Sequence, residues 1–126
     1  MTGERILVAE DNEKNMKLFR DVLGATGYRT LEATTGAEAV ALAAEHTPDL
    51  VLMDIQMPDV DGVEALRRLR ADARTASIPV LAVTAQAMQG DREHFLAVGF
   101  DGYLSKPVNV RELIGVVRRY CDGRAG

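Results

Sequence analysis

Short apolar runs alternate along the chain with longer segments whose apolar residues recur at helical spacing. The runs occupy residues 5–9, 28–33, 50–53, 78–84 and 102–105. Short and nearly continuous apolar runs are typical of strands buried on both faces, as in a parallel sheet. Repeated strand–helix alternation with right-handed crossovers places helices on both faces of such a sheet. We therefore predict an α/β fold with a five-stranded parallel sheet and five helices.

Capping residues mark the starts of several predicted helices. Asn12 is suited to cap the first helix, which should end near Gly27. Thr35 and Glu38 match a capping box, in which the Glu38 side chain reaches back to the amide of the capping residue. Asn109 is predicted to cap the last helix in the same way.

Two further helices are predicted around residues 63–70 and 89–98. Three arginines flank the apolar positions of the first of these and predict a solvated face: Arg67, Arg68 and Arg70. Residues 123–126 are expected to be a frayed tail. We expect one domain over residues 1–126, with its core at about residues 4–121 and no output domain. The sequence leaves open whether the chain is a piece of a larger regulator or hybrid kinase.

Composition and charge narrow the class of protein. A chain of 126 residues is long enough to bury one real core. Its net charge of −4 and the lack of a basic stripe argue against a nucleic-acid partner. No apolar run approaches the roughly 20 residues that span a bilayer, and no signal-peptide pattern precedes the first strand. The single cysteine, Cys121, cannot form an internal disulfide. We expect a cytoplasmic protein that does not bind membranes.

Polar residues that could bind a ligand or take part in a reaction lie where four of the predicted strands end. They are Glu10 and Asp11, then Asp54, Thr84 and Lys106. Ligands of open α/β sheets bind at the carboxyl ends of the strands, which share one edge. Three carboxylates in a small volume repel one another unless a positive group joins them. The candidates are the Lys106 ammonium and a divalent cation. Mg²⁺ prefers a few carboxylates plus phosphate oxygens, so the cluster predicts a place where Mg²⁺ and a phosphoryl group meet.

The segments around these residues resemble the receiver domains of bacterial two-component response regulators. They are VAEDN, LMDIQMPDVDG, VTA and YLSKP, which begin at residues 8, 52, 83 and 103. The resemblance covers residues 5–120 and implies a flavodoxin-like receiver fold with strand order 2-1-3-4-5. The opening NEKNMKLF, residues 12–19, is further similar to single-domain cell-division regulators of the DivK type. Receivers of hybrid kinases share that opening.

The resemblance implies a role for each residue at the strand ends. Asp54 is expected to accept a phosphoryl group from a histidine kinase or a histidine phosphotransfer protein. Glu10, Asp11, Asp54 and the backbone carbonyl of Gln56 are expected to hold Mg²⁺. Lys106 is expected to pair with a phosphoryl oxygen.

The resemblance also implies how phosphorylation is read out. Thr84 and Tyr103 are the expected switch residues. Their movement repacks the face made by the fourth helix, fifth strand and fifth helix, and so alters binding to a downstream protein. The Lys106–Pro107 bond is expected to be cis, and Gln56 and Gln86 occupy positions that tune the lifetime of the phosphate. A monomer or a weak homodimer is expected.

Two other functions are open at this stage. One is a Mg²⁺-dependent phosphohydrolase with an aspartyl nucleophile. Phosphatases of the haloacid-dehalogenase type carry a second aspartate two residues after the nucleophile, where this chain has Gln56. The other is a receiver that serves as a scaffold independently of phosphate. Such chains usually lose a key group, and none is missing here. We therefore expect a protein that is not an enzyme, beyond catalysing its own phosphorylation and dephosphorylation.

Overall fold

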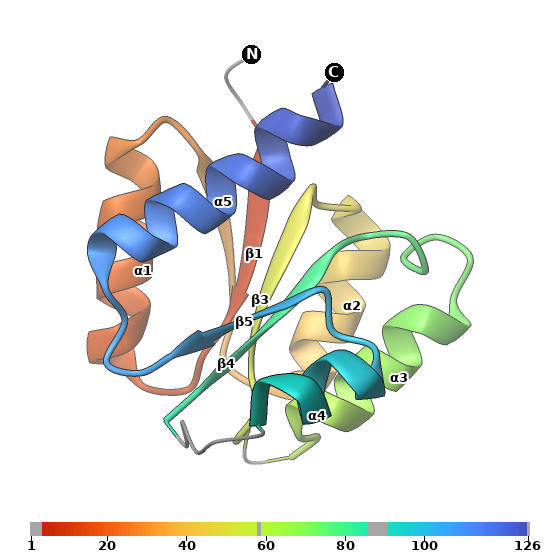
Figure 1. The fold of residues 1–126 in the computed structure, drawn as a ribbon. Helices are drawn as coiled ribbons and strands as arrows, with labels where there is room; N and C mark the ends of the chain where they lie inside the picture. Colours follow the sequence, from red (N-terminus) through yellow and green to blue (C-terminus); the bar gives the residue numbers. More distant parts are fainter. Residues whose placement is uncertain (1–3, 58, 86–90, 126) are drawn as a thin grey trace.

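A five-stranded parallel sheet forms the centre of the protein (Figure 1). The computed structural model describes residues 4–57, 59–85 and 91–125. Within them the strands are β1 (Arg5–Ala9), β2 (Arg29–Ala33), β3 (Leu50–Asp54), β4 (Val80–Thr84) and β5 (Gly102–Ser105). Neighbouring strands are parallel and follow the order β2-β1-β3-β4-β5. The flavodoxin-like strand order implied by the sequence is therefore confirmed.

Helices cover both faces of this sheet (Figure 1). Those in the described residues are α1 (Glu13–Ala25), α2 (Gly36–His46), α3 (Gly62–Ala71), α4 (Asp91–Val98) and α5 (Val110–Ala125). The helices α1 and α5 lie on one face, and α2, α3 and α4 lie on the other. Among the residues described, no helix combines the length and the apolarity that a bilayer-spanning segment requires.

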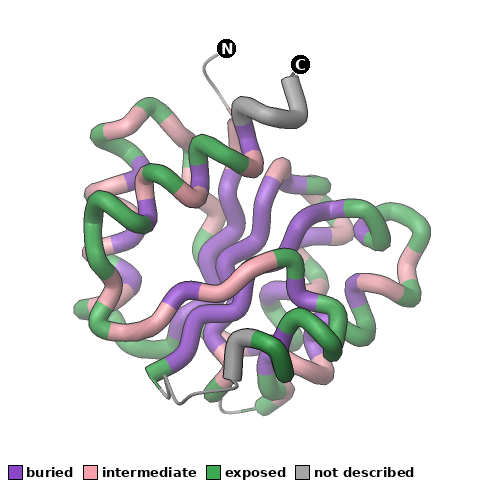
Figure 2. Tube along the Cα trace, viewed as in Figure 1, coloured by how far each residue is buried: buried purple, intermediate pink, exposed green. Residues whose placement is uncertain are grey.

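The three central strands, β1, β3 and β4, are buried on both sides of the sheet, which explains why they read as nearly continuous apolar runs (Figure 2). In β1, Ile6 and Val8 pack into the core beneath α1 and α5. Leu7 and Ala9 point the other way, into the core beneath α2, α3 and α4. Every residue of β3 and β4 is buried. Successive side chains of a strand point to opposite faces of the sheet. Because helices cover both faces, the strand needs apolar residues at consecutive positions.

The predicted helix caps are present, with one difference in detail. Asn12, Thr35 and Asn109 each accept a backbone hydrogen bond from the residue three positions on. The Glu38 side chain reaches back to the amide of Thr34, at 2.7 Å, and not to that of Thr35. The Glu38 side chain therefore accepts from the residue before the cap and not from the capping residue itself.

Some predicted boundaries shift. The fourth strand begins at Val80 and not at residue 78, because Pro79 has no amide hydrogen to donate to the sheet. The prediction of a frayed tail is wrong for residues 123–125, because α5 continues to Ala125. Gly123 lowers helix stability by only about 1 kcal/mol relative to alanine and does not stop it. Gln89, at the predicted start of the fourth helix, lies outside the described residues, as do Pro58 and Gln86.

Arg70 does not belong to the solvated face that was predicted for it. Its guanidinium donates hydrogen bonds to the carbonyl of Ile78, at 2.6 Å, and to the carboxylate of Asp101, at 2.8 Å. The same Asp101 oxygen accepts the amide of Val80, at 2.8 Å. The last turn of α3 thus ties together the starts of β4 and β5. Arg67 and Arg68 do lie in solvent, where both pair with Glu64.

We predict that Arg70→Ala lowers the free energy of unfolding by about 1–2 kcal/mol, because it removes charge-assisted hydrogen bonds that are only partly solvated. Urea unfolding followed by circular dichroism measures the change. Arg67→Ala is the matched control on the same helix, and it should unfold at nearly the wild-type urea concentration. Equal midpoints for the two variants would contradict the role given to Arg70.

Candidate functional site

The carboxyl ends of four strands bring polar side chains to one edge of the sheet. Glu10 and Asp11 follow β1, Asp54 ends β3 and Thr84 ends β4. Lys106 follows β5, and its amide donates to the carbonyl of Thr84 at 2.8 Å. The five residues singled out in the sequence thus lie at the same edge.

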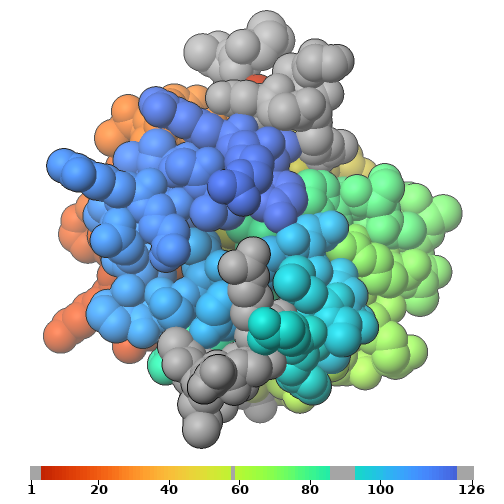
Figure 3. All heavy atoms as spheres, viewed as in Figure 1, coloured from red at the N-terminus to blue at the C-terminus, as the bar shows by residue number. Residues whose placement is uncertain are grey.

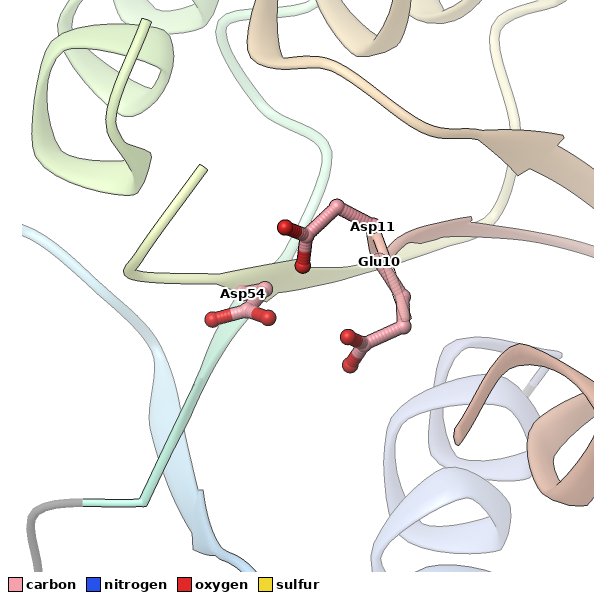
Figure 4. Close-up of side chains that lie close together, drawn as sticks. All are labelled: Glu10, Asp11 and Asp54. Carbon is pink, nitrogen blue, oxygen red and sulfur yellow. The ribbon is translucent and has the colours of Figure 1, made fainter. Parts of the chain in front are cut away.

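Three of these side chains form an acidic cluster (Figure 4). Glu10, Asp11 and Asp54 each offer a carboxylate oxygen, and the three oxygens lie within 4.8 Å of one another. Glu10 and Asp54 are buried, whereas Asp11 is exposed. The cluster is therefore open to solvent on the side of Asp11 and closed where the sheet lies beneath it.

Lys106 is the cation that meets this cluster from β5. Its Nζ lies 2.8 Å from Oδ2 of Asp54 and 2.9 Å from Oε1 of Glu10. Burial lowers the pKa of Lys106, but the two carboxylates outweigh that effect and raise the pKa above its ordinary value. Burial raises the pKa of Glu10, and Lys106 and the Asn12 amide offset the rise only in part. The Lys106 ammonium and the Asn12 amide thus offset only part of the cost of burying the charged Glu10 carboxylate.

The donor set suits a divalent cation. Oε2 of Glu10 accepts the amide of Asn12 at 3.1 Å. Oε1 is fully buried, and Lys106 contacts it as an ion pair at 2.9 Å without a hydrogen bond of good geometry. A buried carboxylate oxygen held in this way has room for a further positive partner. Hard carboxylate oxygens are the ligands that Mg²⁺ prefers, so the residues present fit that ion.

The chain after Asp54 turns back tightly against the strand end. Oδ1 of Asp54 accepts the amide of Gln56 at 2.9 Å, and the amide of Gly62 donates to the carbonyl of Ile55 at 3.0 Å. A Cβ at Gly62 would lie 2.7 Å from the carbonyl oxygen of Asp54, closer than any side chain tolerates. Asp61 then caps α3 by accepting the amide of Glu64 at 2.8 Å. Gly62 therefore allows the β3–α3 connection (residues 55–61) to fold beside Asp54.

The two expected switch residues lie on neighbouring strands. Thr84 is buried at the end of β4, and Tyr103 is half-buried on β5. The Tyr103 ring stacks on Phe95 of α4, with centroids 5.9 Å apart and planes 23° apart. Phe95 is a contact that sequence reasoning missed. Its only signal was an apolar residue in a short helix of weak amphipathic pattern.

A groove of about 630 Å³ runs along the outer face beside Tyr103. Its lining comes from α4, β5 and α5, which Figure 3 shows facing the viewer in cyan to blue. Apolar and aromatic side chains contribute Leu96, Tyr103, Val116 and Tyr120, and charged ones contribute Glu112 and Arg119. Leu96 is 41% exposed, so its apolar side chain is accessible in this groove.

The remaining expected feature concerns the backbone beside the lysine. The Lys106–Pro107 peptide bond is cis, as expected.

Gln56 is exposed, and its backbone amide donates a hydrogen bond to Asp54 as described above. Cys121 is buried within α5 and forms no disulfide.

Comparisons with known proteins agree with this geometry. The sequence model of the response regulator receiver domain matches residues 6–118. The polar-differentiation response regulators DivK of Brucella ovis and Brucella abortus are each 49% identical over 115 residues, covering 91% of this chain and 94% of the relative.

Solved structures show the same fold. The receiver domain of the sensor histidine kinase PA1611 from Pseudomonas aeruginosa, in which a magnesium ion is coordinated in the active site cleft, aligns with a TM-score of 0.88 and 37% identity over 96% of this chain and 99% of that one. The chemotaxis protein CheY4 of Vibrio cholerae aligns with a TM-score of 0.86 and 26% identity over 94% of this chain and 99% of its own. The fold, the edge-of-sheet acidic cluster and the sequence match together establish that this chain belongs to the response regulator receiver domain family.

Proposed function

We propose that this chain is a phosphorylation-switched binding module in which Asp54 accepts the phosphoryl group. The supporting observation is the position of its carboxylate. It stands at the end of a buried strand, within reach of two further carboxylates and 2.8 Å from the Lys106 ammonium. An aspartate needs such surroundings to act as a phosphoryl acceptor, because phosphoryl transfer depends mainly on positioning and on neutralising charge.

The donor is a phosphohistidine of a histidine kinase or a histidine phosphotransfer protein. An Asp54 oxygen forms a bond to phosphorus as the nitrogen–phosphorus bond breaks, and the histidine leaves with its bonding electron pair. Glu10, Asp11, Asp54 and the backbone carbonyl of Gln56 hold Mg²⁺, which when bound neutralises negative charge on the phosphoryl oxygens. Lys106 pairs with a phosphoryl oxygen, which suits a flexible point charge.

The output is a shift between two packings of the α4–β5–α5 face. The Thr84 hydroxyl donates to a phosphoryl oxygen and gives Tyr103 room to turn inward, away from its stack on Phe95. Moving such an equilibrium from mostly off to mostly on needs about 5.5 kcal/mol of differential stabilisation. Several charge-assisted hydrogen bonds of about 1.5–3 kcal/mol each supply that amount. The groove beside Tyr103 is the surface that a downstream protein reads.

The wider setting is also part of this proposal, and membership of the receiver family supports it. The chain catalyses its own phosphorylation and dephosphorylation and is not an enzyme for other substrates. It acts in the cytoplasm, as a monomer or weak homodimer, without nucleic-acid or membrane binding. Similarity to polar-differentiation regulators supports a role in cell-cycle signalling.

The assignment of Asp54 predicts that Asp54→Asn takes up no phosphoryl group from a small phosphodonor in the presence of Mg²⁺, because the amide is not a nucleophile. Wild type should take up one group per chain, and chelation of Mg²⁺ should stop that uptake. Intact-mass spectrometry measures both.

Asp72→Asn is the matched control, because Asp72 is a carboxylate that pairs with Arg74 away from the strand ends. It should behave as wild type. Equal uptake by wild type and Asp54→Asn would defeat the assignment. Multiple-turnover release of phosphate from small esters would favour a phosphohydrolase instead.

The charge balance at the site gives a second prediction. Lys106→Ala leaves the buried Glu10 and Asp54 carboxylates without their ammonium, and we expect a loss of about 2 kcal/mol in the free energy of unfolding without metal. Mg²⁺ should restore part of this loss, because a bound cation replaces the missing charge and stabilises the folded state by mass action.

Urea unfolding with and without Mg²⁺ measures both effects. Lys17→Ala is the control, since Lys17 pairs with Asp21 on the exposed side of α1. Its response to Mg²⁺ should match that of wild type. A Lys106→Ala variant that gains no more from Mg²⁺ than wild type does would count against a shared cation site.

A further inference from the structure

The first turn of α2 is held by a carboxylate from the β3–α3 connection, far away in sequence. Asp59 accepts the amide of Gly36 with Oδ1, at 2.9 Å, and the amide of Ala37 with Oδ2, at 3.2 Å. The first four amides of a helix have no partner inside it. Thr35 satisfies the amide of Glu38. Asp59 therefore completes the cap that Thr35 begins.

The backbones also meet at this contact. A Cβ placed on Gly36 would lie 2.0 Å from the carbonyl oxygen of Val60, so only glycine permits the approach. Val60 and the buried Met57 both pack against the core beneath α2, α3 and α4. Backbone hydrogen bonds, with the largest contribution from the amide of Val60, lower the pKa of the Asp59 carboxyl. The contact is thus close, charged and anchored by apolar packing.

The same connection begins at the proposed metal site. Its first residues follow Asp54 directly, and the amide of Gln56 is bonded to the Asp54 carboxylate. Its last residue leads into Gly62, which is bonded back to Ile55. These two ties fix the ends of the connection beside β3. Asp59 supplies the polar tie between them, and it fastens the connection to a different element, α2.

We propose that Asp59, seated against Gly36, is a positioning residue that holds the β3–α3 connection so that the Gln56 carbonyl stays within reach of Mg²⁺. This inference rests on the proposed function, because it takes the Gln56 carbonyl as a metal ligand. Mg²⁺ requires near-ideal octahedral geometry, so a small retreat of one oxygen ligand weakens binding. Residues that orient ligands from outside the coordination shell typically change metal affinity by about 10–100-fold when removed.

Coupling between two sites is reciprocal. If the Asp59 contact favours Mg²⁺ binding, then Mg²⁺ binding must stabilise that contact in turn. The amides of Gly36 and Ala37, which Asp59 accepts, should therefore exchange with solvent more slowly when Mg²⁺ is bound. A cap that served α2 alone would not respond to a metal at the end of β3.

The test compares Asp59→Ala with Thr35→Ala in the full chain, using Mg²⁺ alone as the probe. Both changes remove an acceptor from the first turn of α2, but only Asp59 belongs to the connection that carries Gln56. Isothermal titration calorimetry should show Mg²⁺ binding about tenfold weaker in Asp59→Ala and within about twofold of wild type in Thr35→Ala. Asp59→Asn keeps one acceptor oxygen and should recover part of the affinity.

Amide hydrogen exchange followed by NMR provides the second readout. Mg²⁺ should slow exchange at Gly36 and Ala37 in wild type, and this response should be lost in Asp59→Ala. Unchanged Mg²⁺ affinity in Asp59→Ala, or equal weakening by Thr35→Ala, overturns the inference. If Asp59→Ala does not fold, Asp59→Asn takes its place. A Mg²⁺ affinity of Asp59→Asn equal to that of wild type then overturns the inference.

The outcomes also separate this inference from the proposed function. A wild-type chain that binds Mg²⁺ and takes up phosphate, together with an Asp59→Ala chain that binds Mg²⁺ equally well, removes only the positioning role. A wild-type chain that binds no Mg²⁺ overturns both.

Discussion

The organising feature of this protein is a cluster of three carboxylates, two of them buried, which within the described residues shares the ammonium of Lys106. Glu10, Asp11 and Asp54 bring their oxygens within 4.8 Å, and Lys106 is the ammonium that contacts two of them. In a partly buried pocket such charges interact more strongly than they would in water. The fold holds these charges close together, an arrangement that a bound cation would relieve. In the function proposed above, this arrangement suits the strand end to a phosphoryl group and its counter-ion.

The rest of the fold places and sustains this arrangement. The strand order sets β1 beside β3, so the residues after one and at the end of the other become neighbours. Apolar cores on both faces of the sheet hold those strands in register, and the hydrogen bonds of Arg70 secure the starts of β4 and β5 at the opposite edge. The Arg70 contacts thus lie at the strand starts, opposite the strand ends that carry the clustered charges. On the outer face, the Tyr103–Phe95 stack links the end of the sheet to α4.

Local patterns in the sequence were enough for the strands, most helix caps and the edge at which the polar residues gather. Apolar periodicity reports burial, and parallel topology then forces the strand ends together. Contacts between segments that are distant in the sequence could not be predicted from these local patterns. Arg70 looked like any other arginine on a solvated helix, and nothing near Asp59 indicated that it would cap α2. Such pairings depend on how elements pack, and the sequence alone shows neither their spacing nor their register.

We infer that the acidic cluster is a cation site because three carboxylates meet there around one ammonium of the described residues. Calorimetric titration of the unphosphorylated chain with Mg²⁺ tests it most directly, with Asp11→Asn as the comparison, since Asp11 is the exposed member of the cluster and its loss disturbs the core least. We expect a single Mg²⁺ site in wild type and markedly weaker binding in Asp11→Asn. Equal affinity in the two proteins, or no binding in wild type, would contradict it.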